Sequence, residues 1–139
     1  MKRKIISIVG IGVVKHGDKY LMTKRKHPMR ELNKWQFPGG GLEHGEKLED
    51  CVIREIKEET GLNVKPVKFV PKVFEIYREL LGDWHGILIV YVCKMIDNSQ
   101  RVVLNDEASE YRWATADEIR KYDSLLGLTK IINEVEKAS

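Results

Sequence analysis

The chain has 139 residues, which is room for one domain spanning residues 1–139. With 42% hydrophobic and 32% charged residues it has the composition of an ordinary globular protein, and it holds no apolar run long enough to span a membrane. The basic and then apolar N-terminus lacks the small-residue cleavage site of a signal peptide, so we interpret it as a core strand. Cys51 and Cys93 belong to no CxxC pair, which favours structural thiols in a reducing cytoplasm.

The net charge of +3 conceals an asymmetry along the chain. Residues 1–42 carry ten Lys and Arg against two acidic residues, whereas residues 43–59 carry seven acidic residues against three basic ones. A basic first third could attract nucleic acid. Beside an acidic segment, a small polyphosphate is the better match, because cations would hold its terminal phosphates while a metal ion bridged it to the carboxylates.

The first third of the chain predicts a β-hairpin followed by a short strand, from its Ile- and Val-rich runs and its turn residues. In chain order we expect a buried strand at residues 4–15, a turn at 16–19, a second strand at 20–26, a polar loop at 27–33 and a short strand at 35–38.

A glycine-rich loop at Gly39, Gly40 and Gly41 then leads into the central helix. This helix is predicted from near Glu46 to Gly61, where glycine would supply a left-handed C-terminal cap. At about 100° per residue, its apolar stripe consists of Leu48, Val52 and Ile56.

The remainder of the chain alternates strand-like segments with loops and ends in a helix. In order we expect an extended block at residues 63–81, a turn at 81–83, a strand at 85–95 and a loop at 97–100. Short strands at 102–104 and 111–113 would flank an acidic loop at 106–110. We then expect a short helix opened by Thr115 or Ala116, and a last helix over 124–137.

Three carboxylates, Glu55, Glu58 and Glu59, fall on one flank of the central helix. Repulsion between like charges at these spacings costs a few tenths of a kcal/mol per pair, on the order of 0.2–0.5, and the helix dipole disfavours negative charge in the last turns. Acidic helix flanks are often simply solvated. Here the flank borders the core-facing stripe and the glycine loop offers free backbone groups, a combination that favours a divalent cation and a phosphate ligand.

The same residues resemble the box of the Nudix hydrolases, which reads G-x5-E-x7-R-E-U-x-E-E-x-G-U with U a bulky aliphatic residue. The match covers residues 40–62 and fills every fixed position, with Gly40, Glu46, Arg54, Glu55, Ile56, Glu58, Glu59, Gly61 and Leu62. The approach Trp35-Gln36-Phe37-Pro38 also fits the family. The resemblance implies an α/β (α+β) fold, namely an α/β/α sandwich with a mixed β-sheet between helices.

The resemblance also implies roles for the residues of the box. Glu55 and Glu59 would be ligands of Mg²⁺, for which Mn²⁺ is a possible substitute, and the Gly40 carbonyl would be a further oxygen ligand. Glu58 would be either a ligand or the general base. Arg54 would orient or neutralise the neighbouring carboxylates, and the residues of mainly structural importance would be Glu46 and Gly61.

Two parts of the predicted site lie outside the box. The general base stays open between a box glutamate and the loop residues Glu107 and Glu110; Glu107 joins Glu55, Glu58 and Arg54 as a catalytic candidate. Residues that would contact substrate are Arg25 for a phosphate, the backbones of Gly39 and Gly41, and the aromatic residues Trp35 and Phe37, with Tyr20 and Trp84 as further stacking candidates that would otherwise be core.

The function that the resemblance favours is a MutT-like nucleoside triphosphate pyrophosphatase. The alternatives are a nucleotide-sugar or ADP-ribose hydrolase, a catalytically idle nucleotide sensor, and a basic RNA-associated module. The prolines Pro66 and Pro71 and the tyrosine Tyr77 do not fall where the ADP-ribose and diadenosine polyphosphate subclasses would need them. We expect a small nucleotide as the partner, no membrane and no nucleic acid, and either a monomer or a homodimer.

Overall fold

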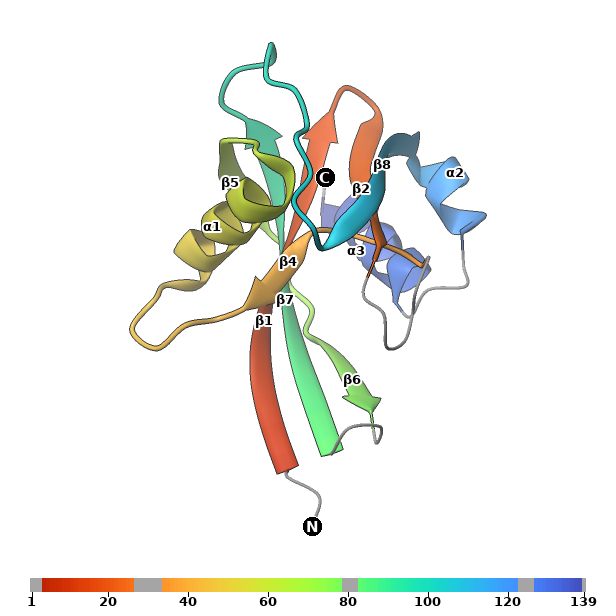
Figure 1. Cartoon of the computed structure of the whole chain (residues 1–139). Helices are drawn as coiled ribbons and strands as arrows, with labels where there is room; N and C mark the ends of the chain where they lie inside the picture. The colour runs from red at the N-terminus through yellow and green to blue at the C-terminus, as the bar shows by residue number, and fades with distance from the viewer. Residues whose placement is uncertain (1–3, 27–33, 79–82, 123–126, 139) are drawn as a thin grey trace.

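The computed structural model describes residues 4–26, 34–78, 83–122 and 127–138. These residues form a mixed sheet with helices on both sides (Figure 1). The strands are β1 (Lys4–His16), β2 (Lys19–Arg25), β3 (Trp35–Gln36), β4 (Gly39–Gly41), β5 (Val64–Phe69), β6 (Phe74–Arg78), β7 (Asp83–Met95) and β8 (Ala108–Thr115). The helices are α1 (Leu48–Thr60), α2 (Ala116–Arg120) and α3 (Leu128–Ala138). The expected mixed sheet between helices is therefore confirmed.

Strand β1 is the centre of the sheet. It pairs in parallel with β7, from Lys4 opposite Asp83 to Val14 opposite Cys93, and antiparallel with β2 and β4. Strands β5 and β6 add to β7, and strands β3 and β8 add to β2, all of them antiparallel. A parallel pair needs a long crossover connection, and the chain between β1 and β7 supplies one that includes α1.

Helix α1 packs against β1 at a place where two glycines leave room for it. A Cβ atom on Gly12 would overlap the side chain of Ile56, and one on Gly10 would crowd Val52. Because the helix lies so close to β1, its side chains Val52 and Ile56 join a buried core cluster with residues of the sheet and of the segment after the helix: Val14, Leu21, Leu62, Val64, Cys93 and Met95. The predicted apolar stripe is confirmed at Val52 and Ile56, which are fully buried.

Helix α3 covers the opposite face of the sheet (Figure 1). Its apolar side chains Leu128, Ile131, Ile132 and Val135 are buried against side chains from β1, β2, β6 and β7. None of the helices in the described part of the chain is long and apolar enough to cross a membrane.

Helix α1 begins two residues later than predicted. We expected a start near Glu46, but the first helical residue is Leu48, because Lys47 has extended backbone angles and Gly45 has a φ of 81°. Glu46 therefore lies in the turn before the helix. The predicted end is confirmed, since Gly61 adopts the left-handed conformation with a φ of 75°.

Two predictions after the central helix are wrong. Residues 102–104 form no strand, and the N–H of Val103 donates instead to the carbonyl of Thr60 at the end of α1 (2.8 Å). The acidic loop expected at 106–110 is shorter, because β8 already begins at Ala108.

The ends of the chain also differ from the expectation. Strand β1 is less buried than predicted, since its first residues Lys4, Ile5 and Ile6 are exposed. Helix α3 begins only at Leu128, after Gly127 with a φ of 81°. The polar loop at 27–33, part of the turn at 81–83 and the expected start of the last helix at 124–126 lie outside the described residues.

Candidate active site

The glycine strand β4 lies directly against the acidic flank of α1. A Cβ atom on Gly40 would overlap the carboxylate of Glu55, so this pair of residues requires glycine at position 40. The carbonyl of Gly40 accepts a hydrogen bond from Cys51 Sγ (3.5 Å). The backbone of β4 and the Glu55 carboxylate therefore place oxygen atoms side by side.

Arg54 holds the acidic residues around this strand together. Its Nε donates to Glu46 Oε2 (2.7 Å), its Nη1 to Glu55 Oε1 (2.8 Å) and its Nη2 to the carbonyl of Gly41 (3.0 Å). Glu58 lies at the edge of this network, 3.4 Å from Nη1, with 53% of its side chain exposed. A planar guanidinium can bind several oxygens at once, and Arg54 does so here.

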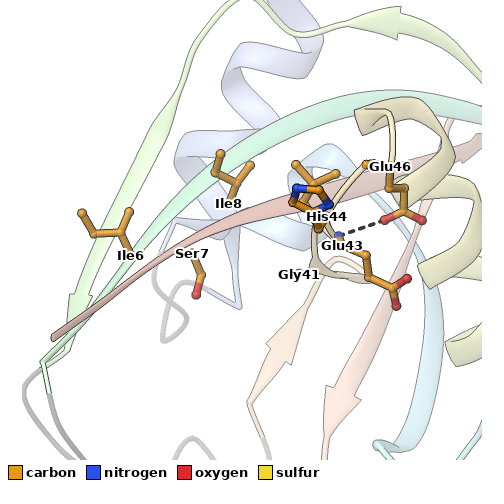
Figure 2. Close-up of a pocket in the computed structure, with 9 residues that line it drawn as sticks. Ile6, Ser7, Ile8, Gly41, Glu43, His44 and Glu46 are labelled. Carbon is orange, nitrogen blue, oxygen red and sulfur yellow. Dashed lines mark hydrogen bonds between the residues drawn. The ribbon is translucent and has the colours of Figure 1, made fainter. Parts of the chain in front are cut away.

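Glu46 anchors the network from the turn before α1. Its carboxylate accepts from two nitrogens of Arg54 and from the backbone N–H of Glu43 (3.1 Å; Figure 2). The Arg54 guanidinium holds the pKa of Glu46 at about 2. Glu46 therefore stays ionised and braces Arg54.

Glu59 is the buried carboxylate of the site. It is only 4% exposed, and its Oε2 accepts a long hydrogen bond from the N–H of Gly39 (3.3 Å). Burial, reinforced by a hydrogen bond to Glu107 and by the negative charges of Glu107 and Glu55, raises the pKa of Glu59 to about 9. The protein thus keeps a carboxyl group in a place that disfavours its negative charge.

Glu107 reaches this cluster from a segment far along the chain. Asn105 donates its N–H to the carbonyl of Glu59 (3.3 Å), and the N–H of Lys26 donates to the carbonyl of Glu107 (3.0 Å). These bonds fasten the segment between the end of α1 and the end of β2. The other loop candidate, Glu110, instead pairs with Lys24 (3.1 Å).

Glu55 is influenced by the same neighbours. Burial raises the pKa of Glu55, the Arg54 guanidinium opposes this rise, and the charges of Glu58 and Glu107 add to it. The structure therefore brings together Glu55, Glu59 and Glu107, with Glu58 at the exposed rim.

Comparison with known proteins bears directly on this arrangement. A family model described as the NUDIX domain matches residues 6–134, nearly the whole chain. The chain belongs to the NUDIX family.

Similar proteins carry related names. An 8-oxo-dGTP diphosphatase of Buchnera aphidicola subsp. Schizaphis graminum is 24% identical over 133 residues, which is 91% of this chain and 91% of that protein. Nucleoside triphosphatase NudI of Salmonella paratyphi B is 30% identical over 94 residues, which is 64% of this chain and 67% of that protein. Among solved structures, the MutT protein from Methanosarcina mazei Go1 superposes with a TM-score of 0.76 at 24% identity, covering 96% of this chain and 97% of its own.

The chain is thus a Nudix hydrolase, and enzymes of this family generally use divalent metal ions. The residues present fit such an ion: the donors are oxygens, and a cation would compensate the negative charge that burial disfavours at Glu59. Among the described residues, no three His, Cys, Asp or Glu side chains converge closely enough to enclose an ion by themselves.

The residues predicted to contact substrate fall in different places. Gly39 and Gly41 flank the acidic cluster of this Nudix hydrolase and contribute the backbone bonds to Glu59 and Arg54. Arg25, at the end of β2, pairs with Ala108, so it lies beside the segment that carries Glu107.

The two aromatic candidates pack on the α3 side of the sheet. Phe37 is 4% exposed and belongs to the core cluster beneath α3. Trp35 packs against that cluster at Tyr122 (ring centroids 5.7 Å apart), with the Arg112 guanidinium 5.3 Å from the Trp35 ring centroid. Both rings are therefore held by packing contacts within the protein.

One contact of the candidate site was missed by sequence reasoning. Helical periodicity placed Glu59 beside Glu55 but gave no sign that the N–H of Gly39 would bind it, twenty residues earlier in the chain. The signal available was the run of glycines itself, whose unhindered N–H groups suit an anionic partner.

Proposed function

We propose that this Nudix hydrolase cleaves the diphosphate linkage of nucleoside triphosphates in a Mg²⁺-dependent reaction. Glu55, Glu59 and the Gly40 carbonyl would hold the ion, and Arg54, which bonds to Glu55 and to the carbonyl of Gly41, would orient them. The observation that carries the proposal is that the glycine strand contacts two carboxylates of the box: Glu55 lies against Gly40, and Glu59 Oε2 accepts from the N–H of Gly39 (3.3 Å). Glu107, which lies 48 residues after Glu59 in the chain, adds to the rise in the pKa of Glu59.

A diphosphate resists water because its anionic oxygens repel a nucleophile. When bound, a divalent ion would neutralise that charge and would lower the pKa of a water molecule enough for it to attack at neutral pH. The protein's own part is to aim its carboxylates and to accept the proton of the attacking water. Glu107 and Glu58 are the two candidates for that base, since Glu58 lies at the rim of the cluster and Glu107 interacts with Glu59.

The preference for nucleoside triphosphates rests on the names of the relatives and on charge. The two similar curated proteins act on 8-oxo-dGTP and on nucleoside triphosphates, by their names. The first 42 residues of this chain carry a local excess of positive charge, and Arg25 lies beside the segment that carries Glu107. Positive charge near the site favours a triphosphate, because a triphosphate carries more negative charge than a diphosphate.

The test is a substrate panel of ordinary and oxidised nucleoside triphosphates, nucleotide sugars and ADP-ribose, with Mg²⁺, Mn²⁺ or EDTA. We expect turnover of triphosphates that needs the metal and falls by about 10²–10³-fold or more in Glu59→Gln, as for the loss of other preorganised electrostatic groups. Glu49→Gln is the matched control, since Glu49 is an exposed carboxylate in the first turn of the same helix.

The panel also separates the competing functions. Turnover of nucleotide sugars or ADP-ribose in preference to triphosphates would contradict the proposed substrate class but would leave the assignment of the site residues unchanged. Metal-dependent binding of a nucleotide without cleavage would indicate a sensor. Full activity of Glu59→Gln would contradict the assigned site.

The identity of the base is tested by a separate pair of variants. Glu107→Gln should lower kcat far more than KM and flatten the acidic limb of the pH–rate profile. Glu110→Gln should leave the profile unchanged, because Glu110 is paired with Lys24. If Glu107→Gln keeps the wild-type profile, Glu58 becomes the remaining candidate.

A further inference from the structure

Among the described residues, none pairs with one edge of β1 at its beginning. Along its other edge β1 is paired with β7 from Lys4 onward, whereas β4 covers only Val9–Ile11 on the outer edge. At the border of that pairing the N–H of Leu42 donates to the carbonyl of Ile8 (2.8 Å). No other described residue pairs with the outer edge of β1 before Ile8.

The direction of the unpaired backbone groups follows from the alternation of a strand. Ile8 bonds toward β4 through its carbonyl, and Gly12 does so through its N–H to the carbonyl of Pro38 (2.9 Å). Even-numbered residues of β1 therefore turn their backbone groups to this edge, and odd-numbered residues turn theirs to β7. The N–H and C=O groups of Lys4 and Ile6 consequently point outward.

The side chains at this edge are apolar and exposed. Ile5 is 41% exposed, Ile6 72% and Ile8 43%. The β1–β7 register runs without a bulge, and this stretch contains no proline. A regular, exposed and apolar edge strand is a template for pairing with another strand.

A pocket of about 510 Å³ lies at the inner end of this edge (Figure 2). Its walls are Ile6, Ser7 and Ile8 on one side and the loop from Gly41 to Glu46 on the other. Glu43 on that loop is 68% exposed and its carboxylate is 3.7 Å from Arg54. An incoming strand with an apolar face and a positive charge would complement these walls.

We propose that two copies of this chain associate through this edge, with β1 of one copy antiparallel to β1 of the other about a two-fold axis. In the register that uses the outward N–H and C=O groups of Lys4 and Ile6, Lys4 of each copy exchanges hydrogen bonds with Ile6 of the other. Ile5 then faces Ile5 across the axis as a pair without hydrogen bonds. The sheets join in the order β6-β7-β1-β1-β7-β6.

A second copy fits this edge because the edge is complementary to itself. A two-fold contact must place the same surface on both sides, and this register sets Lys4 beside Ile6 and not beside another Lys4. Lys4 then approaches the pocket wall that carries Glu43, so its charge meets an opposite charge. The exposed isoleucines lose their contact with water at the same time.

Cysteine cross-linking tests the register. Residues paired without hydrogen bonds have Cα atoms about 4.5 Å apart, within the range of about 4.4–6.8 Å that a disulfide allows. Ile5→Cys should therefore form a covalent dimer under mild oxidation. Ile8→Cys is the matched control: its exposed fraction is nearly the same, but it would lie about 20 Å from its counterpart in the dimer, six residues along the strand. The native Cys51 and Cys93 are buried.

The second test removes the free donor. Ile6→Pro deletes an N–H that no described residue uses, so the β1–β7 pairing should survive while the dimer is lost. Sedimentation equilibrium should give twice the chain mass of 16.1 kDa for the wild type and a single chain mass for Ile6→Pro, with circular dichroism showing that the variant is folded.

Three results would overturn the inference. The first is a wild type that stays at one chain mass at high protein concentration, which would leave the edge to a different occupant or to none. The second is a dimer that survives Ile6→Pro. The third is cross-linking of Ile8→Cys as complete as that of Ile5→Cys.

Discussion

At the scale of single residues, the site depends on one glycine and one buried carboxylate. Gly40 is required because the Glu55 carboxylate occupies the space where a side chain would stand. Glu59 is ionisable but buried, and the other carboxylates add to the cost of its charge. Both features are unfavourable for folding alone, and the proposed divalent cation would offset the cost at Glu59.

Gly40→Ala should destabilise the protein by about 1–3 kcal/mol, because its methyl group would overlap Glu55 and force the carboxylate to move. Urea unfolding measures the change. Gly41→Ala is the matched control, since a Cβ there meets nothing within 4 Å and should change the free energy of unfolding by less than about 0.5 kcal/mol. Equal effects of the two substitutions would contradict the close approach.

The stability of the metal-free protein should fall as pH rises. The pKa of Glu59 is raised to about 9 in the folded state from an ordinary value of 4.5, so the folded state binds more protons between these two values. The stabilisation is fully present below pH 4.5 and is lost as pH rises toward about 9. Each unit of such a shift is worth about 1.4 kcal/mol.

The measurement is thermal unfolding in EDTA from pH 5 to pH 9. Glu59→Gln should be more stable than the wild type at pH 8 and should show a shallower dependence on pH. Added Mg²⁺ should stabilise the wild type most at high pH and the variant much less. A wild type and a variant with parallel pH profiles would show that Glu59 stays ionised in the folded protein.

At the scale of elements, local end signals decided where the helices are. Gly61 ends α1 with a left-handed cap, and the N–H of Gly61 donates to the carbonyl of Lys57 (3.0 Å). Helix α2 begins with a capping box in which Thr115 and Glu118 bind each other's backbone. The start of α1 was predicted too early, because Lys47 has extended backbone angles and the helix begins after it, at Leu48.

Thr115→Ala should lower the free energy of unfolding by about 1 kcal/mol, since Thr115 Oγ1 accepts from the N–H of Glu118 (3.2 Å) and alanine cannot. Chemical denaturation gives the value. Thr115→Ser keeps the acceptor and should restore most of the loss. The proposed triphosphate turnover should be unaffected, because Ala116 and Ile119 of α2 pack with α3 in the core cluster on the other face of the sheet. A loss of turnover in the folded variant would refute this separation.

At the scale of the whole molecule, the position of the site follows from the packing of α1 on the sheet. The missing side chain of Gly12 allows Ile56 to sit directly on β1, and the same contact brings the next turn of the helix to β4. The segment from Asn105 to Glu107 then closes the other side by bonding to the end of α1 and to β2. Three parts of the chain thus meet at one place.

Gly12→Ala should destabilise the protein by about 1–3 kcal/mol, because its Cβ would overlap the Cδ1 methyl of Ile56. Ile56→Val removes that methyl and alone should cost about 0.5–1.5 kcal/mol. The double variant should cost less than the sum of the two, and a double-mutant cycle in urea measures the difference. If the costs of Gly12→Ala and Ile56→Val simply add, the new methyl group is accommodated by a movement of the whole helix away from the sheet and not by the space left at Ile56.

The amino-acid sequence by itself determined the features that depend on neighbours along the chain. The N-terminal hairpin, the central helix with its apolar stripe and glycine cap, and the short capped helix were all predicted, since turns, caps and helical periodicity act over a few residues. The spacing of the box also predicted that Glu55, Glu58 and Glu59 share a flank, because helical geometry alone requires it.

Only the tertiary structure decided the features that depend on distant residues. It separated Glu107 from Glu110, which are three residues apart in sequence but face Glu59 and Lys24 respectively. It also buried Glu59 and left the first part of β1 exposed, which no local pattern indicated. The physical reason is that burial and hydrogen bonding between remote segments are set by packing of the whole sheet, whereas propensity acts within a single turn or strand.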